Sequence, residues 1–188
     1  MADTRKLECT CGEVQWSIAA QARGTHLLCY CEDCQTYARA LDNGTARLDS
    51  DGATEIFQTL PDNIRFEKGI DHVAPLRLSP KGILRWHATC CGTPIANTLP
   101  KPGIPFVGAV LPPGIKGYGP ITARLSTAGT APHIKETGVL NAQMSVIGRM
   151  LRGLVFGAGR KSPFFGKDGA PITAPRVMSL AERNAARP

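Results

Sequence analysis

The sequence predicts a mainly β protein with a C-terminal helical extension, on three observations. Up to about residue 125, apolar residues come in short runs separated by turn residues, as in antiparallel sheets. The chain then becomes rich in glycine and proline and enters one long amphipathic segment. Seven cysteines occur in three groups, all before that change. We therefore expect a zinc-binding β domain over residues 1–125 and a basic extension over residues 126–188, with an amphipathic helix near 137–156.

The elements of the β domain follow from local patterns. GEVQWSIAA alternates Val14, Trp16 and Ile18 with polar residues, which is the period of a half-buried strand. THLLCY predicts a second strand, and CEDCQTYARAL predicts a short helix with Glu32 and Asp33 in its first turn, where acidic residues suit the helix dipole. Further strands are expected in TEIFQTL and NIRFEKG, in a hairpin of APLRLS and GILRWHA around the turn PKG, and in IPFVGAVL.

The extension contains one segment with helical periodicity, GVLNAQMSVIGRMLRGLVFG. Arg149 and Arg152 lie off its apolar stripe. The stripe residues are spaced by 4, 3, 4 and 3 positions: Leu140, Met144, Ile147, Leu151 and Leu154. We expect this stripe to pack onto the β domain. The alternative is that the helix lies on an anionic membrane or on a partner protein. Glycines and prolines after residue 157 predict an irregular arm.

The positive charge of the chain is concentrated in the extension. The net charge is +7, but residues 1–137 carry 14 Lys and Arg against 13 Asp and Glu, whereas residues 138–188 carry 8 against 2. An anionic partner, such as a membrane surface or nucleic acid, would therefore bind the extension. Aromatic residues that could stack on bases are few.

The chain contains no segment that suggests insertion into or export across a membrane. No window approaches the ~20 apolar residues that a membrane span requires, so we expect no integral membrane segment. No apolar run follows the charges of the first residues, so we expect no cleaved secretory signal and a cytoplasmic location. In a reducing compartment, an odd number of clustered cysteines indicates metal binding or chemistry rather than a disulfide framework.

The first and last cysteine groups predict one closed metal site. On a regular strand, Cys9 and Cys11 would lie ~6.5 Å apart, too far for sulfurs that must each sit ~2.3 Å from one zinc ion. The pair must therefore form a tight turn, which Gly12 permits. Joined by Cys90 and Cys91, the pair would make a structural site with four thiolates. Neighbouring residues of an extended chain face opposite ways, so His87 is the reserve ligand in place of Cys90.

The middle group, Cys29, Cys31 and Cys34, then has no fourth thiol. Zinc held by three residues with one open position is typical of catalytic sites, because water or substrate takes that position. The alternative is that this group binds nothing or closes on a histidine. No catalytic residue can be assigned from the sequence. The nearby titratable groups are expected to be solvated or packed: Glu32, Asp33 and His26.

Three motifs together resemble the glutathione-dependent formaldehyde-activating enzyme family, whose relatives include centromere protein V. The motifs are CTCGEV, HLLCYCEDCQ and RWHATCCGTP, and the resemblance covers residues 8 to about 110. It implies a β-tent fold of small antiparallel sheets organised by zinc. It also implies that Cys9, Cys11 and Cys91 hold a structural zinc, and that the middle group holds a second zinc near which a glutathione adduct forms.

The chain departs from the family pattern at two positions. The first cysteine of the later pair would fall at Ala88, and Cys90 is the nearest substitute; Tyr30 stands where the family often has histidine. The resemblance implies a carbon-sulfur lyase that acts on a small thiol or thiol adduct, such as S-hydroxymethylglutathione formed from glutathione and formaldehyde. The alternative is a non-catalytic zinc-stabilised module whose basic extension docks on a partner, a membrane or nucleic acid.

Overall fold

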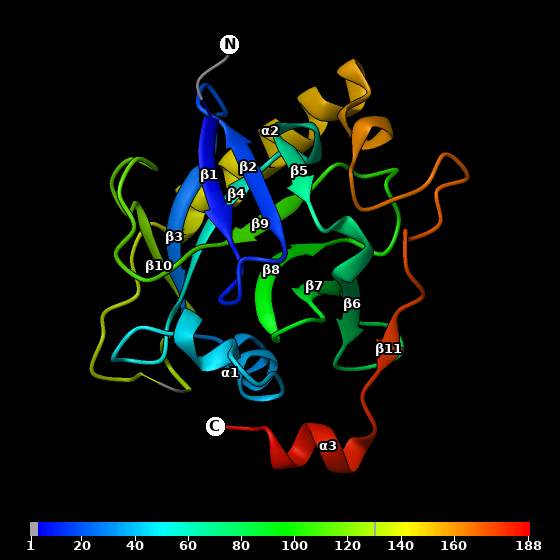
Figure 1. Cartoon of the computed structure of the whole chain (residues 1–188). Helices are drawn as coiled ribbons and strands as arrows, with labels where there is room; N and C mark the ends of the chain where they lie inside the picture. The colour runs from blue at the N-terminus through cyan, green and yellow to red at the C-terminus, as the bar shows by residue number, and fades with distance from the viewer. Residues whose placement is uncertain (1–3, 130) are drawn as a thin grey trace.

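The computed structural model describes residues 4–129 and 131–188 and shows a mainly β protein with two sheets (Figure 1). The smaller sheet is antiparallel and has the order β1-β2-β5, with bounds β1 (Thr4–Glu8), β2 (Gln15–Ala19) and β5 (Ile64–Lys68). The larger sheet has the order β10-β3-β4-β9-β8-β7-β6-β11. Its strands are β3 (Thr25–Cys29), β4 (Thr54–Thr59), β6 (Val73–Arg77), β7 (Leu84–Ala88), β8 (Thr93–Thr98), β9 (Val107–Val110), β10 (Ala123–Leu125) and β11 (Arg176–Val177).

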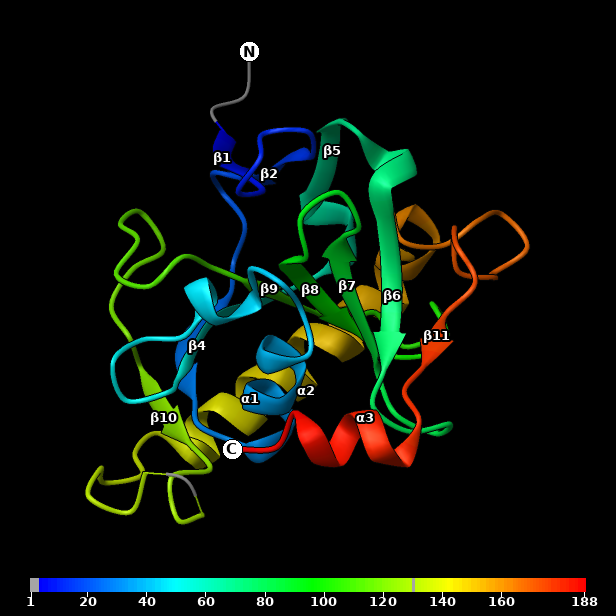
Figure 2. The same cartoon turned by 60° about the horizontal axis from the view of Figure 1, so that its bottom comes forward.

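Three α-helices accompany the sheets: α1 (Glu32–Arg39), α2 (Val139–Phe156) and α3 (Leu180–Ala185). The α2 helix packs against β3, β4 and β10. Figures 1 and 2 both show α3 beside α1, so the C-terminal end of the chain lies close to the segment that carries the middle cysteine group. Among the described residues, no helix combines the length and the hydropathy needed to cross a bilayer.

The main core lies between the two sheets and confirms the predicted inward side of the segment GEVQWSIAA, which contains β2. Val14, Trp16 and Ile18 are fully buried there. Trp86 of β7 joins them, and Phe164 packs against the Trp86 ring with their centroids 5.0 Å apart. Because Phe164 belongs to the extension, residues from both parts of the chain build this core.

The structure adds to the sequence predictions in one place and corrects them in another. TEIFQTL and NIRFEKG are strands, as expected, and the structure places them in different sheets as β4 and β5. The extension is not irregular to its end, because β11 pairs with β6 and α3 follows. Ser179 and Glu182 form a capping box at the start of α3. The pattern Ser-x-x-Glu was therefore a readable signal for this helix.

The expectation that the apolar stripe of α2 packs onto the β domain is wrong. Its five residues are between 49% and 69% exposed. The helix is instead buried at two small residues, Ala142 and Gly153. Ala142 packs with Leu27 and Ile56 of the larger sheet, and Gly153 lies close to Pro105 and Leu60 outside the strands. This arrangement turns the large side chains outward.

Candidate metal centres

Two hairpin turns bring four cysteines together. Cys9 and Cys11 lie in the turn between β1 and β2, where Gly12 has a φ of +74° and donates its N–H to the Cys9 carbonyl. Cys90 and Cys91 lie in the turn between β7 and β8. Because that turn is not extended, the two neighbouring side chains lie on the same side, with their sulfurs 3.9 Å apart.

Sulfur positions in this four-cysteine cluster match those of a tetrahedral site. The Cys9 sulfur lies 3.5 Å from that of Cys11 and 3.8 Å from that of Cys90. Two thiolates that bind one tetrahedral zinc at ~2.3 Å lie about 3.8 Å from each other. All four ligand atoms lie within 4.8 Å of one another. The reserve ligand His87 is not a member of this cluster, and its buried Nδ1 has no hydrogen-bond partner.

Side chains around the four-cysteine cluster join the two turns. The Thr93 hydroxyl accepts a hydrogen bond from the Thr10 N–H at 3.0 Å and lies 3.1 Å from the Cys91 sulfur. Asn43 donates to the Cys91 carbonyl at 2.6 Å. Arg47 is 7% exposed and donates to the carbonyl of Glu8. A buried guanidinium therefore lies close to this group of thiols.

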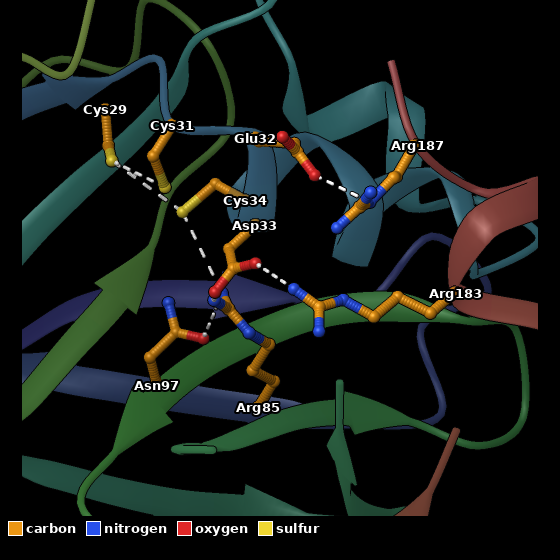
Figure 3. Close-up of polar contacts among 9 residues, drawn as sticks. All are labelled: Cys29, Cys31, Glu32, Asp33, Cys34, Arg85, Asn97, Arg183 and Arg187. Carbon is orange, nitrogen blue, oxygen red and sulfur yellow. Dashed lines mark hydrogen bonds and ion pairs between the residues drawn. The ribbon is translucent and has the colours of Figure 1, made fainter. Parts of the chain in front are cut away.

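The middle group forms a second cluster, the trio, which consists of Cys29 at the end of β3, Cys31 and Cys34 in α1. Figure 3 shows the three sulfurs pointing toward one another. The Cys29 sulfur lies 3.4 Å from that of Cys31 and 3.7 Å from that of Cys34. Cys31 is the N-terminal cap of α1, so the positive end of the helix dipole lies beside the thiols and favours their ionised form.

The fold around the trio is apolar on one side and charged on the other. Its cysteines pack with Leu27, Ile56, Ala123, Leu125 and Ala142. On the other side, Arg85 of β7 is 4% exposed, and its Nη1 lies 3.8 Å from the Cys34 sulfur. The same guanidinium donates to Oδ1 of Asn97 at 3.5 Å and lies 3.5 Å from Oδ2 of Asp33 (Figure 3).

The carboxylates next to the trio are held by the C-terminal helix region. Oδ1 of Asp33 pairs with Arg183 at 3.4 Å, and Glu32 pairs with Arg187 at 2.7 Å (Figure 3). His26 lies in another buried pair, 2.8 Å from Glu55. Each of the three nearby titratable residues therefore has a partner within the fold. None is free to act as a general base without leaving that partner.

In each cluster, one thiol has a lowered pKa. Hydrogen bonding with Cys29 and Cys31, together with the charge of Arg85, holds the pKa of Cys34 well below its usual value. Hydrogen bonding with Cys31 and Cys34 raises the pKa of Cys29. In the four-cysteine cluster, burial raises the pKa of Cys91, but hydrogen bonds with Thr93 and Cys11 outweigh it and lower the pKa to about 6. A lowered pKa favours the thiolate, which is the form of cysteine that binds metal.

Both clusters could hold metal ions, and their thiol ligands fit zinc. Four converging thiols provide a closed tetrahedral site, whereas the trio provides three ligands of four. All seven cysteines predicted as ligands lie in one of the two clusters, divided as expected. The structure adds Arg47 and Arg85, which sequence reasoning missed. A single arginine between apolar residues of a strand, as in LRW, was the available signal for Arg85.

Sequence comparison assigns the chain to a family. The sequence profile of a family of unknown function (DUF6151) matches residues 1–175. The chain belongs to this family. No curated protein matches it. A crystal structure of a Rhodobacter sphaeroides protein is similar at 14% sequence identity over 60% of this chain and 91% of that chain, with a TM-score of 0.41. A TM-score of this size does not establish a shared fold.

Proposed function

We propose that this member of the family is a zinc enzyme of the carbon-sulfur lyase type that acts on a thiol adduct such as S-hydroxymethylglutathione. The observation that carries the proposal is the trio: three converging thiols, one ligand short of a closed site, beside a buried cation. The resemblance of the three cysteine motifs to the glutathione-dependent formaldehyde-activating family supports the same chemistry. The proposed reaction joins the thiol sulfur to the carbonyl carbon of formaldehyde, and the thiol proton ends on the carbonyl oxygen.

Zinc, when bound to the trio, would supply a Lewis acid for a thiol or a carbonyl oxygen. The chain's own groups would set the charge around it. Three thiolates and one zinc ion carry a net charge of about −1, and Arg85 lies close enough to Cys34 to compensate it. Asp33 in turn holds Arg85 in place. An anionic fourth ligand, such as a substrate thiolate, is therefore less strongly repelled.

The alternative of a basic docking arm loses support from the ion pairs of the extension. Arg183 and Arg187 pair with carboxylates of α1, and Arg176 pairs with Glu182 at 2.7 Å. Phe164 is buried in the core. Three arginines of the extension are therefore paired with carboxylates of this protein, so fewer cations are available to bind phosphates than the net charge of the extension suggests. The buried Phe164 is likewise not available to a partner.

The test of the proposal combines metal content with competition by glutathione. We expect the native protein to hold two zinc equivalents and the Cys31→Ser variant to hold one. In the cobalt-substituted protein, glutathione should change the visible spectrum of the trio site and leave a Cys31→Ser sample unchanged. One zinc equivalent in the native protein, with the trio freely alkylated in the folded state, would contradict the proposal.

Turnover is measured separately. The rate at which glutathione and formaldehyde exchange with their adduct can be followed by NMR, with and without protein. We expect acceleration by the zinc-loaded protein and none by Cys31→Ser. If glutathione binds at the trio but the exchange rate is unchanged, the site is a thiol-binding site and the lyase assignment is wrong.

A further inference from the structure

Helix α2 exposes an unusually large apolar surface for a helix at the outside of a protein. Besides the five stripe residues, Val155 is 80% exposed and Phe156 is 72% exposed. Contiguous apolar patches on a typical monomer reach roughly 300–600 Å² and are often functional. The stripe from Leu140 to Leu154 runs along about four helical turns, and an exposed apolar surface of this length is expected to be covered by a partner.

The outward orientation of the stripe is built into the contacts of α2. A Cβ at Gly153 would lie 2.7 Å from a side-chain carbon of Pro105 and 2.8 Å from one of Leu60, so this side of the helix must face the protein. Arg149 lies on the same side and donates to the Thr25 hydroxyl at 2.8 Å. Rotation of the helix to bury the stripe would break these contacts.

The spacing of the stripe is that of a helix that packs against another helix. Steps of 4, 3, 4 and 3 residues reproduce the a and d positions of a heptad repeat. In coiled coils, the flanking e and g positions decide which partners attract or repel. In α2, all of these flanking positions are uncharged: Asn141, Gln143, Gly148, Met150 and Val155. No like charges would therefore meet if two identical stripes faced each other. A Cβ at Gly148 would meet open space, so a second helix could approach closely there.

The charges of α2 fit an anionic bilayer less well. Helices that lie on membranes carry several Lys and Arg on their polar face. The only charged residues of α2 are two arginines, one of which is turned inward onto Thr25. The other, Arg152, lies over the Phe156 ring, with its guanidinium carbon 5.5 Å from the ring centroid, within the ~6 Å limit of a cation–π contact.

We propose that the stripe is the interface of a homodimer, in which α2 of one copy packs against α2 of a second copy. Exposed fractions of 49% to 80% for the stripe residues and Val155 correspond to roughly 500–700 Å² per copy, so that two copies would bury about 1,000 Å², which a specific interface requires. Ile147 lies midway along α2. In a two-fold symmetric pair it faces Ile147 of the second copy.

The experiment is sedimentation velocity of the full-length, zinc-loaded chain over a range of concentrations. We expect a reversible monomer–dimer equilibrium in the wild type. Ile147→Glu places two like charges opposite each other and should weaken association by roughly 100-fold or more. The matched control is Ser145→Glu, which adds the same charge at an exposed position of α2 outside the stripe and should leave the dimer intact. Far-UV circular dichroism spectra and zinc contents that match those of the wild type show that both variants fold; the thermal midpoint is not used, because loss of the dimer would itself lower it.

Three results would overturn the proposal. The wild type could stay monomeric at all concentrations, Ile147→Glu could associate like the wild type, or Ser145→Glu could dissociate the dimer equally. Flotation with phosphatidylglycerol vesicles tests whether an anionic bilayer covers the stripe instead of a second copy of the chain. Binding of a monomeric wild type to these vesicles, lost in Ile147→Glu and kept in Ser145→Glu, would assign the stripe to an anionic bilayer instead.

Discussion

The two cysteine clusters differ in how far apart along the chain their members lie. The four-cysteine cluster joins the β1–β2 turn to the β7–β8 turn, so that Cys9 and Cys90 meet across 81 positions. The trio comes from one short segment in which Cys29 and Cys34 are five positions apart. A metal in the first cluster would connect two sheets, whereas a metal in the second would connect residues that β3 and α1 already hold together. We therefore expect the first cluster to govern stability and the second to govern chemistry.

The clusters also differ in charge balance. Each has one buried arginine, Arg47 near the four cysteines and Arg85 beside the trio. Zinc with four thiolates carries a net charge of about −2, and zinc with three carries about −1. One guanidinium therefore leaves the first site negative and the second neutral, since the Asp33 carboxylate beside Arg85 is itself balanced by Arg183. A neutral site with an open position can accept an anionic ligand at less electrostatic cost than a negative one.

Loss of a ligand from the four-cysteine cluster should destabilise the protein more than any other substitution considered below. Because structural zinc contributes directly to folding free energy, Cys91→Ser should lower the free energy of unfolding by about 4 kcal/mol or more, a shift of roughly 10 °C in the thermal midpoint for a chain of this size. Calorimetry of zinc-loaded protein measures it. A chelator should give a similar loss in the wild type.

The matched substitution in the trio tests whether the two clusters contribute differently to stability. Cys31→Ser should remove one zinc equivalent and shift the thermal midpoint by only about 3 °C, because a ~1 kcal/mol change moves it by roughly 2–4 °C. If the two variants are destabilised equally, the division between a stabilising and a chemical cluster is wrong.

A second, smaller effect is expected from Arg85. Outer partners of metal ligands typically change metal affinity by about 10–100-fold, so Arg85→Met should weaken zinc binding at the trio by that factor and leave the four-cysteine cluster unchanged. Competition with a chromogenic chelator resolves the two sites. Arg65→Met is the control, because the Arg65 side chain is 81% exposed and lies at neither cluster. Equal affinities at the trio in Arg85→Met and the wild type would exclude a role for this charge.

Much of the β architecture could be predicted from the sequence, because its signals are local. The alternation of Val14, Trp16 and Ile18 placed one buried strand face, and the glycine after Cys11 placed a turn. Which sheet a strand joins depends on pairings between distant residues, and NIRFEKG was therefore assigned no sheet. The thiols could be grouped by elimination, yet the choice of Cys90 over His87 required the turn geometry.

The features that the sequence could not reveal depend on three-dimensional neighbours. Periodicity identified an apolar stripe on α2, but it cannot tell whether a stripe faces the protein or solvent. Gly153 decided this, through its close contact with Pro105 and Leu60. Arg47 and Arg85 are distant in sequence from the cysteines that they approach. A charged residue in a short apolar strand indicates a buried partner but does not identify it.

The smallest expected effect concerns the ion pair between α3 and α1. Arg183 and Asp33 are 27% and 50% exposed as side chains, and pairs this accessible contribute about 0–1 kcal/mol to stability. Arg183→Ala should therefore shift the thermal midpoint by no more than about 3 °C. Lys68→Ala, which removes an exposed pair with Glu13 far from the trio in sequence, is the control.

The two variants should differ in the reactivity of Cys34, because Asp33, the partner of Arg183, also pairs with Arg85. In metal-free protein, iodoacetamide should alkylate Cys34 at a different rate in Arg183→Ala than in Lys68→Ala, and the difference should shrink at high salt because partly exposed charges are screened. Equal rates would show that the ion pair between α3 and α1 does not influence the trio. The reactivity of Cys34 would then depend on Arg85 and not on Arg183.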